Sequence, residues 1–113
     1  MNLSDRHCVP VASGSAAMSQ TEESAFLGEI SGWELSREGV HTLCKEITFP
    51  TYLEGADFVR AAAGIADSEN HHPDLQLLYK RVIIRISTHA VKGLSLNDFI
   101  LAAKFDLIQA KRR

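Results

Sequence analysis

The sequence contains few of the residues that build disulfide frameworks or zinc sites. Its two cysteines, Cys8 and Cys44, are far apart in a chain of 113 residues. A disulfide scaffold or a zinc site needs more ligands at close spacing. We therefore interpret Cys44 as a packed or edge thiol in a strand, and Cys8 as part of an N-terminal arm.

Long apolar runs are absent as well. No stretch approaches the roughly 20 apolar residues that cross a bilayer, and the N-terminus lacks a continuous hydrophobic segment of the signal-peptide type. We therefore expect no membrane partner and a cytoplasmic location.

An excess of charge of one sign is also missing. The 12 Lys and Arg residues against 14 Asp and Glu residues give a formal net charge of −2. This balance argues against direct binding of nucleic acid through bulk charge. The basic run Lys111-Arg112-Arg113 ends a predicted helix, where we interpret it as a solvated tail that favours the negative end of the helix dipole.

The length leaves room for one domain, since folded domains commonly contain about 100 to 150 residues. Residues 1–18 mix Ser, Gly, Ala and Pro without helical or strand periodicity, which predicts a mobile N-terminal arm. Residues 19–113 then form the single folded domain. Its core is small, so burial of further apolar surface between subunits is expected to favour a homo-oligomer.

Three capping patterns mark the starts of helices. Each places a hydroxyl three residues before a carboxylate, so that the two side chains satisfy unpaired amides of a first helical turn. The patterns are Ser19-x-x-Glu22, Thr51-x-x-Glu54 and Ser95-x-x-Asp98. The predicted helices cover 19–30, run from 51 to a point before His71, and run from 95 towards the C-terminus.

Between the helices, apolar residues that alternate with polar ones predict two hairpins. The expected strands are 33–35, 40–49, 75–79 and 82–88, with a turn at Lys80-Arg81. The order α-β-β-α-β-β-α lacks the long crossovers of a parallel sheet. It predicts an α+β fold with a four-stranded antiparallel sheet and helices packed on one face.

Three of the five histidines lie close together between the second helix and the last one. With their neighbours they read Asp67-x3-His71-His72-Pro73-x5-Tyr79-x9-His89-x8-Asp98. This spacing resembles that of the pterin-4a-carbinolamine dehydratases, which are also called 4a-hydroxytetrahydrobiopterin dehydratases. The likeness extends from about Leu27 to Ile108, and the family implies the same α+β fold.

The resemblance implies an active site built from histidines. His71 and His89 are the candidates for proton transfer, with acid and base left unassigned, and His72 is the candidate for orienting the pterin. Imidazole suits both tasks because its ordinary pKa of about 6.5 keeps both forms available near neutrality. The candidate substrate-binding or supporting residues are Asp67, Asn70, Pro73, Ser87, Thr88, Tyr79 and Asp98.

Position along the chain predicts specific contacts for some of these residues. Asp67 precedes His71 by one helical turn, so its carboxylate is expected to orient that imidazole. If the strand over 82–88 stays regular, His89 lies opposite the aliphatic stripe of that strand. Asp98 is expected to close a helix cap, with a direct catalytic role as the alternative. Tyr79 is interpreted as either core or pocket wall.

We expect neither a metal site nor a cofactor. The side chains of His71 and His72 diverge if the segment is extended, the sequence lacks His-x-x-x-His and paired-cysteine spacings, and dehydration does not need a metal. The two remaining histidines, His7 in the arm and His41 near a turn, are expected to be solvated.

The activity that the resemblance implies is dehydration of 4a-hydroxytetrahydrobiopterin to quinonoid dihydropterin and water, in pterin recycling. The family also implies homodimers joined through sheet edges, often paired into homotetramers. Two alternatives stay open. One is a non-enzymatic assembly factor or coactivator that binds a protein partner, as in RuBisCO assembly, and the other is a dehydratase for another pterin, such as a molybdopterin-related compound. The presence of all three histidines favours the enzyme.

Overall fold

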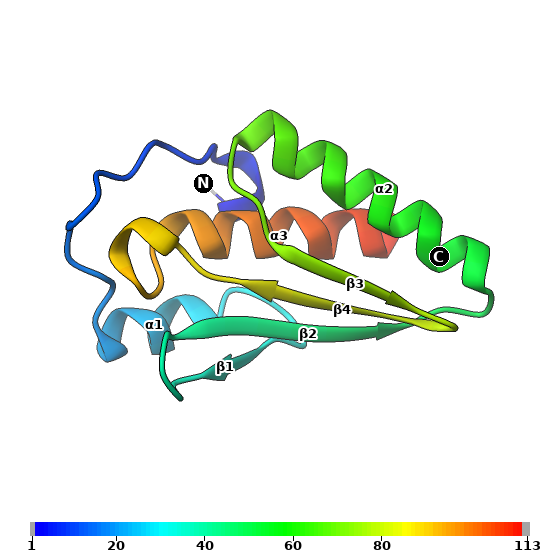
Figure 1. The fold of residues 1–113 in the computed structure, drawn as a ribbon, viewed down its shortest axis with the longest axis horizontal. Coiled ribbons are helices and arrows are strands. Elements are labelled where there is room, and N and C mark those ends of the chain that lie inside the picture. The colour runs from blue at the N-terminus through cyan, green and yellow to red at the C-terminus, as the bar shows by residue number, and fades with distance from the viewer. Residues whose placement is uncertain (1, 112–113) are drawn as a thin grey trace.

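The computed structural model describes residues 2–111, so Arg112 and Arg113 of the predicted basic tail lie outside the described residues. Three helices and four strands follow one another in the predicted order α-β-β-α-β-β-α (Figure 1). They are α1 (Gln20–Leu27), β1 (Glu34–Ser36), β2 (Thr42–Thr48), α2 (Tyr52–Glu69), β3 (Asp74–Leu78), β4 (Arg81–Ile86) and α3 (Leu96–Lys111). Two short 3-10 turns, η1 (Leu3–Asp5) and η2 (His89–Val91), complete the fold.

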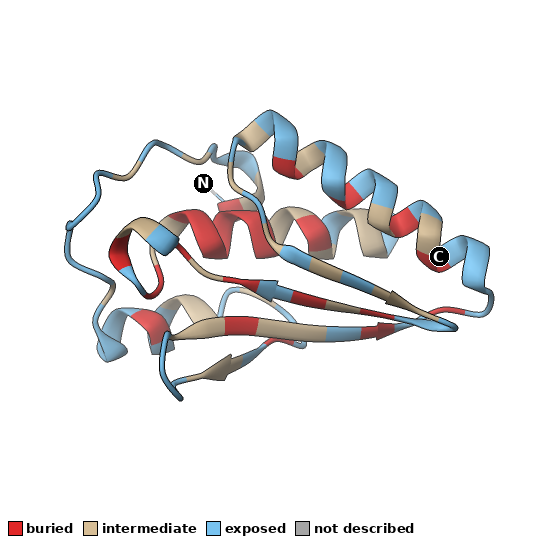
Figure 2. Cartoon of the chain, in the orientation of Figure 1, coloured by how far each residue is buried: buried red, intermediate tan, exposed pale blue. Residues whose placement is uncertain are grey.

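The four strands form one antiparallel sheet in the order β1-β2-β4-β3, which confirms the predicted fold class. β4 lies in the middle, where Ile84 is paired with Lys45 of β2 and Leu75 of β3. The side chains of Val82, Ile84 and Ile86 are all buried, whereas Arg81 and Arg85, which point to the other face, are exposed. One face of the sheet therefore carries the core, and the helices cover that face (Figures 1 and 2).

Aromatic side chains from the helices fill the space above the sheet. Phe58 of α2 and both Phe99 and Phe105 of α3 are buried. α2 approaches β3 closely at Gly55, where an added Cβ would lie 3.1 Å from Cδ1 of Leu77. Glycine at this position therefore lets the helix rest against the sheet without displacing the leucine. None of the helices in the described part of the chain is long and apolar enough to cross a membrane.

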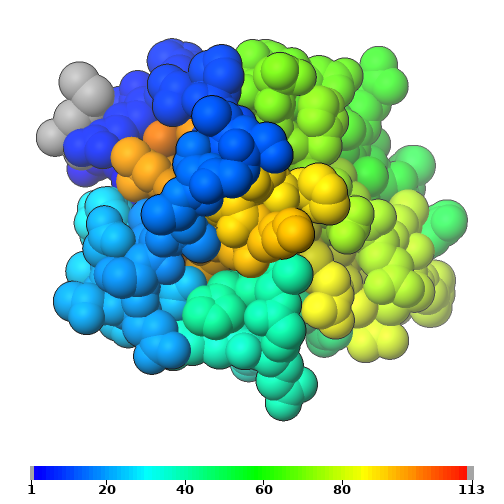
Figure 3. All heavy atoms as spheres, turned by 60° about the vertical axis from the view of Figure 1, so that its left-hand side comes forward, coloured from blue at the N-terminus to red at the C-terminus, as the bar shows by residue number. Residues whose placement is uncertain are grey.

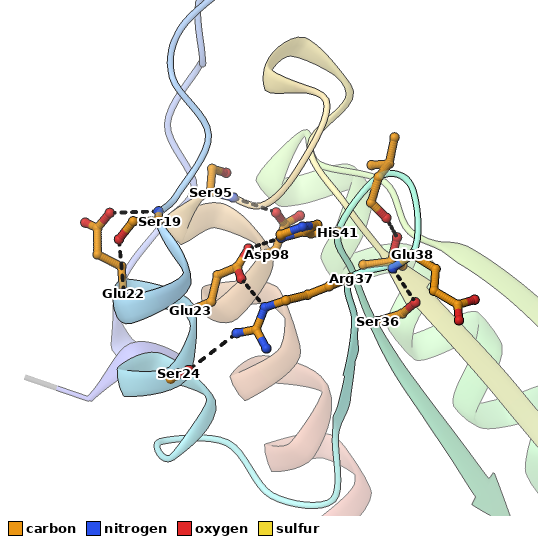
Figure 4. Close-up of polar contacts among 12 residues, drawn as sticks. Ser19, Glu22, Glu23, Ser24, Ser36, Arg37, Glu38, His41, Ser95 and Asp98 are labelled. Atoms are coloured by element: carbon orange, nitrogen blue, oxygen red, sulfur yellow. Dashed lines mark hydrogen bonds and ion pairs between the residues drawn. The ribbon is translucent and has the colours of Figure 1, made fainter.

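α1 is tied to the sheet by a buried carboxylate. Its predicted capping box is present, with the Ser19 and Glu22 side chains each bonded to the other's backbone N–H. One residue further on, Glu23 is fully buried and binds Nδ1 of His41 at 2.7 Å and Nε of Arg37 at 3.0 Å (Figure 4). The prediction that His41 is solvated is therefore wrong, because a partner from a distant helix buries most of its ring.

The N-terminal segment, which the sequence predicts to be a mobile arm, contacts the rest of the domain at several points. Leu3 is only 5% exposed and joins the core beside α3. Further along, Gly14 donates its N–H to the carbonyl of Ala90 at 3.1 Å, and Met18 donates to that of Leu94 at 2.8 Å. The segment lacks periodicity because isolated side chains and backbone groups hold it, and it runs over the surface between α2 and η2 (Figure 3).

Candidate active site

His71 projects from the turn that ends α2. Asn70 is the C-cap and has a left-handed backbone (φ 52°, ψ 40°), which bends the chain sharply out of the helix. The N–H of His71 then bonds back to the carbonyl of Ala66 at 3.2 Å. Because this bond spans the turn, the position of His71 is fixed by the helix end rather than by a flexible loop.

The imidazole of His71 is held by Asp98, which is fully buried at the start of α3. Nε2 of His71 lies 2.6 Å from Oδ1 of Asp98. An ionised carboxylate can only accept hydrogen bonds, so Nε2 must be the donor. The other ring nitrogen, Nδ1, is then the one available to a ligand.

The second oxygen of Asp98 has two further partners. Oδ2 accepts from the Ser95 N–H at 2.8 Å and from the Thr88 hydroxyl at 2.7 Å (Figure 4 shows the Ser95 contact). Thr88 Oγ1 is also 2.7 Å from Ser95 Oγ, so Ser95 must donate in that pair. Asp98 therefore closes the predicted cap and also holds a candidate catalytic ring.

His89 lies beyond the end of β4 and not within it. The strand ends at Ile86, and Thr88 forms an isolated bridge with Gly93 before His89 begins the η2 turn. The predicted strand over 82–88 therefore extends two residues too far, and the condition under which His89 would lie opposite the aliphatic stripe is not met, because the pairing partner after Ile86 is a short local loop. The His89 side chain is exposed, and the residue lines the same cleft as His71.

Asp67 does not contact His71 as predicted. Its Oδ1 instead lies 3.0 Å from Nε2 of His72, and both side chains are largely exposed. The left-handed turn at Asn70 explains the difference, because it breaks the helical spacing that would bring Asp67 and His71 together. Asp67 does not line the cleft that holds the histidines.

Tyr79 and Pro73 also lie away from this cleft. Tyr79 belongs to the β3–β4 turn, is 72% exposed, and has the Lys80 Nζ 5.3 Å from its ring centre. Both predicted locations for Tyr79, core or pocket wall, are therefore wrong. Pro73 is half-buried in the connection between His72 and β3.

The cleft has a volume of about 650 Å³. Three chain segments and Asn97 line it, and the segments are 8–11, 68–72 and 87–90. Its size lies within the range of small-molecule sites, which is about 300 to 1,000 Å³. The structure thus brings together the candidate residues His71, His72 and His89 with Asn70, Ser87 and Thr88 around one cleft.

Sequence reasoning missed the first of these segments and its two anchors. The backbone N–H of Cys8 donates to Oε1 of Glu69 at 2.6 Å, and the Asn97 amide makes two bonds with the backbone of Val9. Burial alone would raise the pKa of the Glu69 carboxyl, but the bonds from Cys8 and His7 and the charge of Lys104 hold it below its ordinary value. No periodic pattern predicts such contacts. The apolar residues near Val9 are the sequence feature that could have indicated that this segment packs against the domain.

The residues around the cleft do not assemble a metal site. Within residues 2–111, no group of three or more His, Cys, Asp or Glu side chains is placed so that it could hold a metal ion. The chemistry that the cleft offers is therefore that of imidazoles, one of them held by a buried carboxylate, with hydroxyl and amide groups beside them.

Comparison with known proteins identifies relatives over most of the chain. Residues 16–108 match the family model described as pterin 4 alpha carbinolamine dehydratase. A protein of Xanthomonas oryzae pv. oryzae (strain PXO99A), named "Putative pterin-4-alpha-carbinolamine dehydratase", is 43% identical over 102 residues, which are 90% of this chain and 86% of the relative. A protein of the same name from Stenotrophomonas maltophilia (strain K279a) is 44% identical, with 90% and 87% covered.

Two solved structures share the fold at lower identity. The transcriptional coactivator/pterin dehydratase from Brucella melitensis has a TM-score of 0.77 and 24% identity, over 81% of this chain and 97% of that one. A pterin dehydratase-like protein described as a RuBisCO assembly factor in the alpha-carboxysome has a TM-score of 0.59 and 19% identity, over 68% and 88%. From the match over residues 16–108 and the 43% identity, the chain belongs to the pterin-4a-carbinolamine dehydratase family.

Proposed function

We propose that this protein dehydrates 4a-hydroxytetrahydrobiopterin, a pterin-4a-carbinolamine, to quinonoid dihydropterin and water. The observation that carries the proposal is that His71 and His89 approach one cleft from two different elements, and that a buried carboxylate holds His71. The family match supports the same chemistry. The physiological role would be pterin recycling, and neither a metal nor a redox cofactor is required.

The reaction breaks one carbon–oxygen bond and forms one carbon–nitrogen double bond. The hydroxyl leaves as water after it receives a proton, and the neighbouring ring nitrogen loses a proton. A positioned acid and a positioned base each typically contribute about 10² to 10⁴ in rate. His71 and His89 are our candidates for these two groups, because an imidazole can serve both as a proton donor and as a proton acceptor.

The contact with Asp98 gives His71 a specific advantage in proton transfer. The imidazolium form of His71 exists either before the transfer, if the ring is the acid, or after it, if the ring is the base. A carboxylate 2.6 Å from Nε2 stabilises that charged form, which favours proton uptake if the ring is the base and retention of the proton until the transfer if the ring is the acid. It also fixes the orientation of the ring, so the side chain does not have to change rotamer for Nδ1 to reach a ligand.

The other cleft residues are assigned supporting tasks. His72 would orient the heterocycle, and Asn70 and Ser87 offer hydrogen bonds to its polar edge. The Thr88 hydroxyl already has Asp98 and Ser95 as partners, so Thr88 acts by positioning Asp98. Asp67 would act only through its contact with His72.

The test is the rate of dehydration of freshly generated 4a-hydroxytetrahydrobiopterin. Because this compound also decays unaided, the wild-type protein is compared with a His71→Ala, His89→Ala double variant whose fold is checked by circular dichroism. Acceleration by the wild type that the double variant loses is the expected result. Equal rates for the two proteins would reject this activity.

A role without catalysis is the second candidate, and the likeness to the RuBisCO assembly factor is the observation that favours it. In that case the cleft would not need to bind a pterin. A fluorescence titration with biopterin and with a molybdopterin-related compound separates the candidates. Binding of biopterin supports the leading proposal, preference for the other compound supports a different pterin substrate, and binding of neither supports the assembly role.

A further inference from the structure

The cleft has a third wall that the histidines do not supply. Residues 8–11, which we call the strap, line it together with the two histidine-bearing segments. The family match begins at residue 16, so the strap lies outside the pattern that defines the family. In Figure 3 the strap is the blue surface between the green end of α2 and the yellow region that contains η2.

Both ends of this part of the chain are anchored to the histidine-bearing segments. On one side, Cys8 donates its backbone N–H to Glu69, which stands two residues before His71. On the other side, Gly14 donates its N–H to the carbonyl of Ala90, the residue after His89. The strap therefore crosses from one catalytic candidate to the other, and its position is tied to both.

The side-chain amide of Asn97 makes two hydrogen bonds with the backbone of the strap. Its Oδ1 accepts from the Val9 N–H at 3.0 Å, and its Nδ2 donates to the Val9 carbonyl at 2.7 Å. Because Asn97 holds the backbone, the Val9 side chain is not used in the anchor. Val9 lines the open cleft and is 65% exposed there.

The composition of the strap suits an apolar contact with a flat ring. Val9, Pro10 and Val11 offer no side-chain hydrogen-bonding group, and Pro10 has a fixed φ, which lowers the entropy lost when the segment is ordered around a ligand. Ligand sites combine such apolar surface with a few polar groups. Here the polar groups come from 68–72 and 87–90.

We propose that the strap is the apolar wall that grips the pterin ring, and that Asn97 is the positioning residue that holds this wall in place. The inference rests on the proposed pterin-binding function and assigns part of the pterin-binding surface to the strap. The strap contributes to binding and leaves proton transfer to the histidines. Its loss should therefore raise KM and leave kcat unchanged.

The test uses Val9→Ser in the full-length protein. Val9 is largely exposed, so the substitution should not disturb folding, and Val40→Ser is a matched control at another exposed valine (48%) outside the cleft. We expect Val9→Ser to raise both KM for 4a-hydroxytetrahydrobiopterin and Kd for biopterin on the order of fivefold, from the lost apolar contact. Val40→Ser should change neither.

The role of Asn97 is tested by a double-mutant cycle. Asn97→Ala should raise KM and Kd by a similar factor, and Val9→Ser should add little in that background, because the wall is already released. Asn97→Asp keeps one of the two bonds and should lie between Asn97→Ala and the wild type. An Asn97 that acts only through overall folding would instead lower kcat and add fully to Val9→Ser.

The outcomes separate this inference from the proposed activity. If the wild type accelerates dehydration and Val9→Ser retains wild-type KM and Kd, the strap is not a binding wall although the activity stands. If the wild type fails to accelerate dehydration but binds biopterin in a Val9-dependent manner, the wall is supported and the activity is rejected. If the wild type does not bind biopterin, both proposals are overturned.

Discussion

At the scale of single residues, Asp98 performs two tasks with its two oxygens. One oxygen holds the ring of His71, and the other closes the start of α3 and accepts from Thr88. A group with three partners from separate segments cannot move without disturbing all of them. The imidazole ring of His71 is therefore held in place by the same carboxylate that caps the first turn of α3.

Asparagine substitutions should distinguish the contribution of Asp98 to catalysis from that of Asp67. In Asp98→Asn, the side-chain nitrogen cannot accept, so either the bond from His71 or the two bonds from Thr88 and Ser95 are lost, and an imidazolium at His71 has no counter-charge. We expect kcat for dehydration to fall on the order of tenfold or more. Asp67→Asn, which affects only the exposed contact with His72, should change kcat less than about twofold. Steady-state kinetics decide the matter, and equal effects would contradict the assignment.

The thiol of Cys8 should be unreactive at ordinary pH. Burial, followed by the charge of Glu69, raises its pKa to about 12. The reactive thiolate therefore forms only as the pH approaches that value. With iodoacetamide at pH 8, a Cys44→Ser variant, which retains Cys8, should react at least about tenfold more slowly than a free thiol peptide with a pKa near 8.5. A rate equal to that of the peptide would show that Cys8 is not enclosed as described.

At the scale of elements, the end of α2 determines where His71 points. Asn70 holds φ at 52°, a conformation that glycine adopts freely and a residue with a Cβ resists. Asn70→Ala should lower the free energy of unfolding by about 1 kcal/mol, whereas Asn70→Gly should leave it unchanged or slightly higher. Urea denaturation measures both variants. Equal stability of the two would show that the turn is not set by backbone strain.

The same pair of variants tests the role of the Asn70 amide in ligand binding. Asn70→Gly retains the turn but removes the side chain. A higher Kd for biopterin with unchanged stability would assign the amide to the ligand. A Kd like that of the wild type would leave Asn70 with a structural task alone.

The sequence was sufficient for features whose causes are local. Capping pairs act over three residues, so the helix starts at Ser19 and Thr51 were correctly predicted. The alternation in β4 likewise placed Val82, Ile84 and Ile86 on the buried face. These patterns were also enough to give the order of elements and the antiparallel sheet.

The parts that could not be predicted depend on contacts between distant segments. The partner of His71 is Asp98, 27 residues away, and not Asp67 in the adjacent helical turn. The bridge between Thr88 and Gly93 ended the strand before His89. Such choices depend on which elements meet in space, and periodicity carries no information about them. The histidine set itself was identified through its spacing, which matches that of a known family.

At the scale of the whole molecule, the buried Glu23 joins α1 to the chain around β1 and β2. Its carboxylate binds both His41 and Arg37, and all of its surface is shielded (Figure 4). A buried charge with two bonded partners is costly to leave incomplete. The attachment of α1 therefore depends on this buried carboxylate as well as on the packing of Phe26 against Phe99.

Glu23→Gln should lower the free energy of unfolding by about 1 to 3 kcal/mol, because a neutral amide has one accepting oxygen in place of two and no charge to pair with Arg37. Glu29→Gln is the matched control, since Glu29 is exposed just after the same helix, and it should change stability by less than about 0.5 kcal/mol. Thermal and urea unfolding provide the measurement. Similar losses in both variants would mean that the buried contacts contribute little.

Within the strap, Val9 and Pro10 are exposed, and Val9 is held at Asn97 through its backbone alone, whereas the Cys8 side chain packs on the core and bonds to the Asn97 carbonyl. Substitutions at the Val9 and Pro10 side chains therefore cost the fold little, whereas substitutions around Asp98 affect both core and chemistry. One side of the cleft can therefore be altered at Val9 and Pro10 while the core and the histidines stay in place, which makes the ligand preference of the cleft adjustable without loss of its proton-transfer groups.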